Sequence, residues 1–128
     1  MSGKKTAIIT GASGGIGAGL VGGFLGESYN VVATSREASR KLPRSNNLVL
    51  LDGDIGNQQT AAYAVDAAVN NFGSIDVLVN NAGIFLKKPF TDFTTEDFDA
   101  LVSTNLLGCV YITQRTVKEM LKKNRDAL

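Results

Sequence analysis

The chain has 128 residues, a single cysteine, no histidine and a formal net charge of +1. These figures exclude an intrachain disulfide, histidine-based triads and histidine metal sites, and no segment approaches the roughly 20 apolar residues of a membrane span. The near-neutral charge also gives no electrostatic reason to expect nucleic acid or an anionic membrane as a partner. We therefore expect one domain over residues 1–128, without a metal site or signal peptide, in the cytoplasm.

Short apolar runs alternate with segments of helical spacing along the chain. The expected strands are 6–10, 30–34, 47–51 and 75–79, and the expected helices are 15–26, 58–72 and 94–123. Residues 35–43 are expected to form a short helix or loop, and 84–93 a loop. Strands that alternate with helices predict an α/β fold with a parallel sheet and right-handed crossovers.

The first and the last expected helix show further sequence patterns. In the first, the apolar residues Ile16, Leu20 and Phe24 lie four residues apart, with Val21 and Leu25 alongside, which is the spacing of a helix. Thr94 followed by Asp97 predicts a capped N-terminus for the last helix. A break in that helix is expected near residues 105–108. Its expected apolar face consists of Phe98, Leu101, Val102, Leu106, Val110, Thr113, Val117 and Met120.

A glycine-rich turn joins the first strand to the first helix, where residues 10–17 read TGASGGIG. The free N–H groups of a helix N-terminus and the helix dipole favour an anion such as a phosphate there. The pattern Gly17-x-Gly19-x-x-Gly22 also matches a dinucleotide motif, but it lies inside the helix, so the context excludes it. No Gly-Lys-Ser/Thr follows the turn, which excludes a P-loop.

Residues 10–17 resemble the TGxxxGxG turn of the short-chain dehydrogenase/reductase family, and residues 80–83, NNAG, resemble a second motif of that family. The resemblance covers essentially the whole chain and corresponds to the N-terminal half of a family member. It implies a truncated Rossmann-type, doubly wound parallel sheet with strand order 3-2-1-4. It also implies NAD(P) binding and hydride transfer with an alcohol or carbonyl. The alternative is that both motifs are ordinary glycine turns.

The resemblance assigns cofactor contacts to residues of both motifs and of the loop after the third strand. These residues are Gly11, Ser13, Gly15, Ile16, Gly17, Asp54, Ile55, Asn81, Ala82 and Gly83. Within the loop, Asp54 and Ile55 resemble the pair that contacts adenine, although Asp52 is a second candidate for the carboxylate. Asp76 is expected to be a structural acid.

The end of the second strand indicates which cofactor is preferred. NAD sites of this type place a carboxylate there to bind the ribose 2′-hydroxyl, whereas this chain has Ser35 and Arg36. A hydroxyl and a guanidinium suit a 2′-phosphate, so we favour NADP over NAD. The alternative is that Arg36 is a solvated surface charge.

Three residues of the last helix invite comparison with catalytic groups. Asn105 matches the family asparagine that stabilises a helix break and anchors a water in a proton relay, and we expect it on the apolar face. A core asparagine with only structural hydrogen bonds remains an equal alternative. Cys109 is expected to be buried, and Tyr111, followed by Arg115 rather than lysine, is expected to pack.

No Tyr-x-x-x-Lys pair occurs in the sequence, because Ala33, Ala67 and Arg115 lie four residues after the three tyrosines. The resemblance implies that the family's acid/base tyrosine, its lysine and its serine come after the helix in which this chain ends. Two hypotheses follow: an NADP-dependent oxidoreductase represented by its nucleotide-binding half, or a non-catalytic nucleotide-binding or oligomerisation module. The open apolar edge of the fourth strand predicts a homo-oligomer or a piece of a longer polypeptide.

Overall fold

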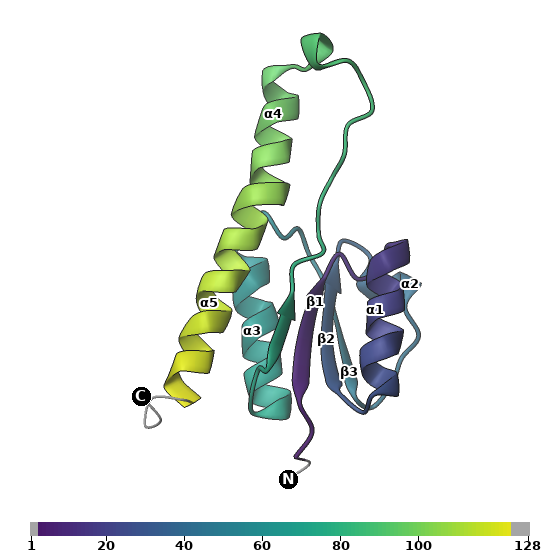
Figure 1. Ribbon diagram of the computed structural model, residues 1–128, viewed down its shortest axis with the longest axis vertical. Coiled ribbons are helices and arrows are strands. Elements are labelled where there is room, and N and C mark those ends of the chain that lie inside the picture. Colours follow the sequence, from purple (N-terminus) through teal and green to yellow (C-terminus); the bar gives the residue numbers. More distant parts are fainter. Residues whose placement is uncertain (1–2, 124–128) are drawn as a thin grey trace.

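The computed structural model describes residues 3–123. They form a parallel sheet of four strands in the order β3-β2-β1-β4, with α1 on one face and α3 and α5 on the other (Figure 1). The predicted α/β architecture and strand order 3-2-1-4 are therefore confirmed. All three pairings are parallel because each connection crosses over the sheet through a helix or loop.

The elements begin and end within a few residues of the expected positions. The strands are β1 (Thr6–Thr10), β2 (Asn30–Ser35), β3 (Leu48–Asp52) and β4 (Val77–Val79). The helices are α1 (Gly15–Gly26), α2 (Ala38–Lys41), α3 (Gln58–Phe72), α4 (Thr95–Leu101) and α5 (Gly108–Lys123), with a 3-10 turn at Phe90–Asp92 and a π-helix at Val102–Leu107. No helix within residues 3–123 is both long and apolar enough to cross a membrane.

β4 begins at Val77, two residues later than expected, and Asp76 hydrogen-bonds to Thr6 just before the strand. The Asp76 carboxylate accepts a hydrogen bond from the Thr6 N–H at 2.8 Å, and the Asp76 N–H donates to the Thr6 carbonyl at 2.8 Å. Asp76 thus fixes the start of β1, which confirms the expectation of a structural acid.

The two central strands, β1 and β2, are covered on both faces of the sheet. On one face, Ile8 and Val32 pack with α3 and with Ile112 of α5. The buried α3 surface there consists of three alanines and Val65, and the small alanines allow the helix to lie close to the sheet. On the other face, Ile9 and Val31 pack with α1. This double coverage explains why β1 and β2 are apolar on consecutive residues.

The apolar residues of α1 divide between the sheet and a cavity. Leu20 and Phe24 are partly buried against the sheet, but Ile16 is 75% exposed. Ile16 lies in the first helical turn and lines a cavity together with the glycine turn. A β-carbon at Gly22 would meet no atom within 4 Å, so that glycine weakens the helix without serving close packing.

The last helical segment is one long rod whose upper part, α4, extends beyond the sheet (Figure 1). Thr94 and Asp97 form the predicted capping box: the Thr94 hydroxyl accepts from the Asp97 N–H, and the Asp97 carboxylate accepts from the Thr94 N–H. The pKa of Asp97 is lowered, mainly by its hydrogen bond with Lys88. The expected break near residues 105–108 is present as the π-helix.

The buried face of α5 differs in part from the predicted one. The buried residues are Gly108, Ile112 and Thr116, whereas Val110 and Val117 are 45% and 42% exposed. The predicted apolar face is therefore wrong at Val110 and Val117, but Met120 packs against the core as predicted. Cys109 is exposed, which corrects the expectation that it is buried. Tyr111 packs against the core as predicted.

Candidate nucleotide-binding site

A cleft opens beyond the carboxyl ends of the strands. The strand order reverses at β1, because β2 and β3 follow on one side of it and β4 lies on the other side. Open parallel sheets bind ligands at such a position. Two adjoining cavities of about 410 and 530 Å³ share Gly11, Ser13 and Gly83. One contains the glycine turn and the start of α1, and the other extends to the ends of β2 and β3.

The glycine turn has no room for side chains at two positions. Gly11 has φ +62°, and a β-carbon there would lie 2.8 Å from the Ala82 Cα. A β-carbon on Gly17 would overlap the Gly11 carbonyl oxygen and lie 2.8 Å from Asn81 Nδ2. The two motifs are thus packed backbone to backbone. No side chain caps the N-terminus of α1, so its first N–H groups point to the cleft without a competing acceptor from a capping residue.

Hydrogen bonds lock the turn after β1 to the turn after β4. The Thr10 hydroxyl accepts from the N–H groups of Asn81 and Ala82, at 3.0 and 2.9 Å. The Asn81 amide donates to the Gly11 carbonyl at 3.1 Å. The Asn81 side chain therefore shapes the glycine turn from behind, and Ala82 and Gly83 line the cleft.

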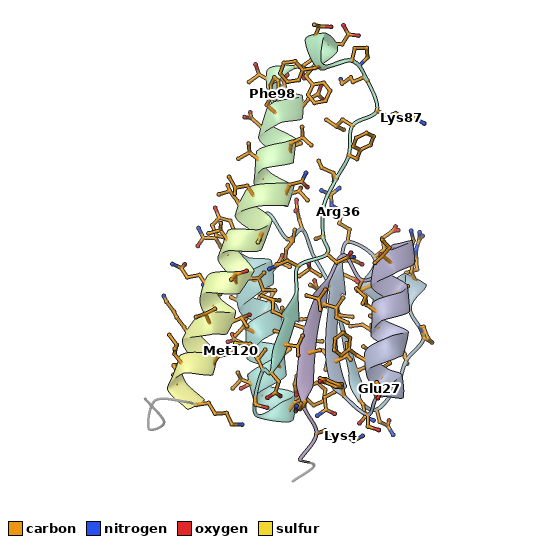
Figure 2. The ribbon with its side chains drawn as sticks, viewed as in Figure 1. Lys4, Glu27, Arg36, Lys87, Phe98 and Met120 are labelled. Atoms are coloured by element: carbon orange, nitrogen blue, oxygen red, sulfur yellow. The ribbon has the colours of Figure 1, made fainter. Side chains whose placement is uncertain are left out.

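Four predicted cofactor residues meet where the ends of β2 and β3 face the glycine turn. The Ser35 hydroxyl donates to the Ser13 hydroxyl at 2.8 Å. Arg36 Nη2 lies 3.7 Å from Asp54 Oδ2, with the side chains 67% and 52% exposed. Figure 2 shows Arg36 above the carboxyl edge of the sheet. Arg36 therefore lines the cleft with a largely exposed side chain.

The structure separates the two candidate carboxylates of the loop after β3. Asp52 accepts hydrogen bonds from the N–H and hydroxyl of Ser39, and these bonds hold the pKa of Asp52 below its usual value. Asp52 does not line the cleft, whereas Asp54 does. Ile55 also lines the cleft and is almost fully buried, since it packs against Gly108.

Asn105 joins the π-helix to the segment after β4. Its Oδ1 accepts from the Ile84 N–H at 2.7 Å, and its Nδ2 donates to the Ile84 carbonyl at 3.0 Å. Asn105 is exposed, so the expectation that it points with the apolar face is wrong.

Two cleft residues, Glu37 and Lys41, were missed in the sequence. Glu37 Oε2 lies 3.2 Å from Lys41 Nζ, and Glu37 Oε1 lies 3.0 Å from Arg40 Nη2. The hydrogen bond with Lys41, followed by the charge of Arg40, lowers the pKa of Glu37. Their proximity to Arg36 in the chain was the available signal. Within the described residues, no group of three His, Cys, Asp or Glu side chains could hold a metal ion.

Comparison with known sequences decides the family. The sequence profile described as short chain dehydrogenase matches residues 5–127. The chain belongs to the short-chain dehydrogenase/reductase family. It is therefore a member of a family of oxidoreductases that bind a nicotinamide cofactor.

Individual short-chain dehydrogenases/reductases align with the chain over half of their length. A 3-oxoacyl-[acyl-carrier-protein] reductase of Buchnera aphidicola is 30% identical over 98% of this chain and 53% of its own. A crystal structure of 3-ketoacyl-(acyl-carrier-protein) reductase from Brucella melitensis, complexed with NADH, has a TM-score of 0.89 and 30% identity, covering 96% of this chain and 53% of that one. A single-residue variant of ElxO with NADPH bound has a TM-score of 0.84 and 34% identity, covering 94% of this chain and 52% of that one. The chain thus spans about half the length of the relatives it matches.

Proposed function

We propose that the chain is the nucleotide-binding half of an NADP-dependent oxidoreductase that transfers hydride between NADP(H) and an alcohol or carbonyl. The observation that carries the choice of NADP is the convergence of Ser13, Ser35 and Arg36 in the cleft. The end of β2 has no carboxylate among its last residues, and the guanidinium and hydroxyls match the oxygens of a 2′-phosphate.

In the proposed complex, the remaining predicted cofactor residues contact two different parts of the cofactor. The N–H groups at the start of α1, at Gly15, Ile16 and Gly17, would hold the pyrophosphate. Asp54 and Ile55 line the other cavity and would contact the adenosine part. The bound cofactor would supply the hydride chemistry, and these residues would hold and orient it.

Replacing Arg36 by alanine is expected to weaken NADPH binding about tenfold, the typical value of a hydrogen bond to a charged group, and to leave NADH binding nearly unchanged. The measurement is the dissociation constant of each nucleotide by fluorescence titration. Arg40→Ala is the matched control, because Arg40 pairs with Glu37 but does not line the cleft. Equal losses for both nucleotides in Arg36→Ala would contradict the proposed role.

Asn105 is proposed to contribute to the proton relay as a positioning residue. Both ends of its amide already bond the Ile84 backbone. This arrangement favours a role in holding the π-helix and the segment after β4 in register over direct proton transfer by the side chain.

A non-catalytic nucleotide-binding or oligomerisation module is the second candidate. For the 128-residue chain taken alone, the absence of a Tyr-x-x-x-Lys pair favours it, because the proposed reaction needs an acid/base group, whereas the two intact motifs favour the first candidate. NADPH oxidation by the 128-residue chain with a panel of carbonyls separates the two candidates, and turnover would exclude the second. A cytoplasmic location remains a prediction from the single cysteine.

Self-association is expected in sedimentation velocity, with species heavier than the 13.5 kDa chain. β4 is paired only with β1, which leaves its other edge open within the described sheet. Leu106 and Val110 are 57% and 45% exposed in an apolar stripe along the last helices. Leu106→Glu should therefore shift the distribution to lighter species. A stable, monodisperse monomer of the unaltered chain would count against the proposal.

A further inference from the structure

Carboxylates neutralise both cations at the adenosine end of the cleft. Arg36 and Lys41 line this cavity, and so do Asp54 and Glu37. Arg36 lies 3.7 Å from Asp54, and Lys41 lies 3.2 Å from Glu37. Because each cation faces a carboxylate, the cavity is not the bare cationic pocket that a 2′-phosphate would prefer.

The two pairs differ in how the carboxylate is held. Glu37 precedes Lys41 by one helical turn, so their pairing is local to α2. Asp54 comes from the loop after β3, and its second oxygen accepts the Gly56 N–H at 2.9 Å. This bond fixes the carboxylate, whereas Arg36 is on a long stem and is 67% exposed. Arg36 is therefore the partner that moves when a ligand enters, and the Asp54 charge stays.

The fixed charge acts differently on the two nicotinamide cofactors. A 2′-phosphate that pairs with Arg36 must first displace Asp54 from the guanidinium and then lie close to the remaining carboxylate. A 2′-hydroxyl carries no charge, so NADH neither has to displace Asp54 from Arg36 nor is repelled by its carboxylate.

We propose that Asp54 determines cofactor specificity by limiting the preference for NADP, so that the cleft also binds NADH. This inference rests on the proposed function, in which the cleft holds NAD(P). One unit charge about 4 Å from another changes an affinity about fivefold in a water-like dielectric, and the exposure of this pair makes that dielectric the appropriate one.

The test compares dissociation constants of NADPH and NADH, by fluorescence titration, for the unaltered chain, Asp54→Asn and Asp52→Asn. Asparagine keeps an oxygen for the Gly56 N–H, so the loop is retained. The ratio of NADPH to NADH affinity is expected to rise about fivefold in Asp54→Asn. Asp52→Asn removes the same charge two residues away, from a carboxylate bonded to Ser39, and is expected to leave the ratio unchanged.

Adding Arg36→Ala to Asp54→Asn separates the two parts of the effect. Without Arg36, Asp54 acts on a 2′-phosphate only by direct repulsion. The rise in the ratio of NADPH to NADH affinity caused by Asp54→Asn should therefore be smaller in the Arg36→Ala background than in the unaltered chain. An unchanged ratio in folded Asp54→Asn, or an equal rise in Asp52→Asn, would overturn the role of Asp54. If Asp54→Asn loses its circular dichroism signal, Asp54→Ser repeats the test. Failure of the unaltered chain to bind either nucleotide would instead overturn the proposed function.

Discussion

Replacing Gly17 by alanine is expected to lower the free energy of unfolding by about 3 kcal/mol and to abolish binding of NADPH. The new methyl group would overlap the Gly11 carbonyl oxygen and lie 2.9 Å from the Ala12 Cα. Both neighbours are backbone atoms of the turn, so the clash cannot be relieved by rotating a side chain. The turn or α1 must move, and either movement displaces the N–H groups proposed to hold the pyrophosphate.

Gly19→Ala is the matched control, because Gly19 lies in the same helix and a β-carbon there would meet nothing within 4 Å. It is expected to stabilise the chain by about 0.5–1 kcal/mol, since alanine restricts the unfolded chain and suits a helix. Urea denaturation measures both changes. Equal stabilities for the two variants would show that the close approach at Gly17 does not exist in solution.

Replacing Thr10 by valine is expected to lower the free energy of unfolding by about 1–3 kcal/mol, because the Ala82 N–H loses its acceptor, whereas the Asn81 N–H keeps the Val79 carbonyl at 3.1 Å. The Thr10 hydroxyl accepts from Asn81 and Ala82, and Thr10 is 1% exposed, so water cannot easily substitute for the hydroxyl. Valine has nearly the same shape, so the loss reports the hydrogen bonds and not a cavity. The turn after β4 would loosen, and NADPH binding should weaken with it.

Thr34 provides the control for this substitution. It is also 1% exposed, at the equivalent level of the neighbouring strand, but its hydroxyl has no hydrogen-bond partner in the structure. Thr34→Val should therefore be neutral or stabilising in the same urea experiment, because an unsatisfied buried hydroxyl is removed. A comparable loss in both variants would mean that packing around the hydroxyls, and not the link to Asn81 and Ala82, accounts for the effect.

Features that depend on residues close together in the chain were predicted accurately, and features that depend on residues far apart in the chain were not. The strands and α3 were predicted within a few residues, because apolar periodicity and turn residues are local signals. The capping box at Thr94 was predicted for the same reason, since both partners lie within one helical turn. The family followed from two motifs whose spacing and context could be read directly.

The buried face of α5 could not be predicted by extending the helical pattern from α4. Ile112 and Thr116 are buried where Thr113 and Val117 were expected. Asn105 is exposed and bonds the Ile84 backbone. A break near this position was expected, but the residue pattern alone did not indicate that it would be a π-helix.

The sequence by itself determined the fold class, the glycine turn and the residue types at the ends of the strands, because these depend on neighbours in the chain. Only the tertiary structure decided that Asp52 is bonded to Ser39 of α2 while Asp54 faces Arg36. It also decided that Glu37 and Lys41 line the same cleft. The physical reason is that charges from separate loops meet only after the strands pair, and the balance of these charges bears on which nicotinamide cofactor the cleft prefers.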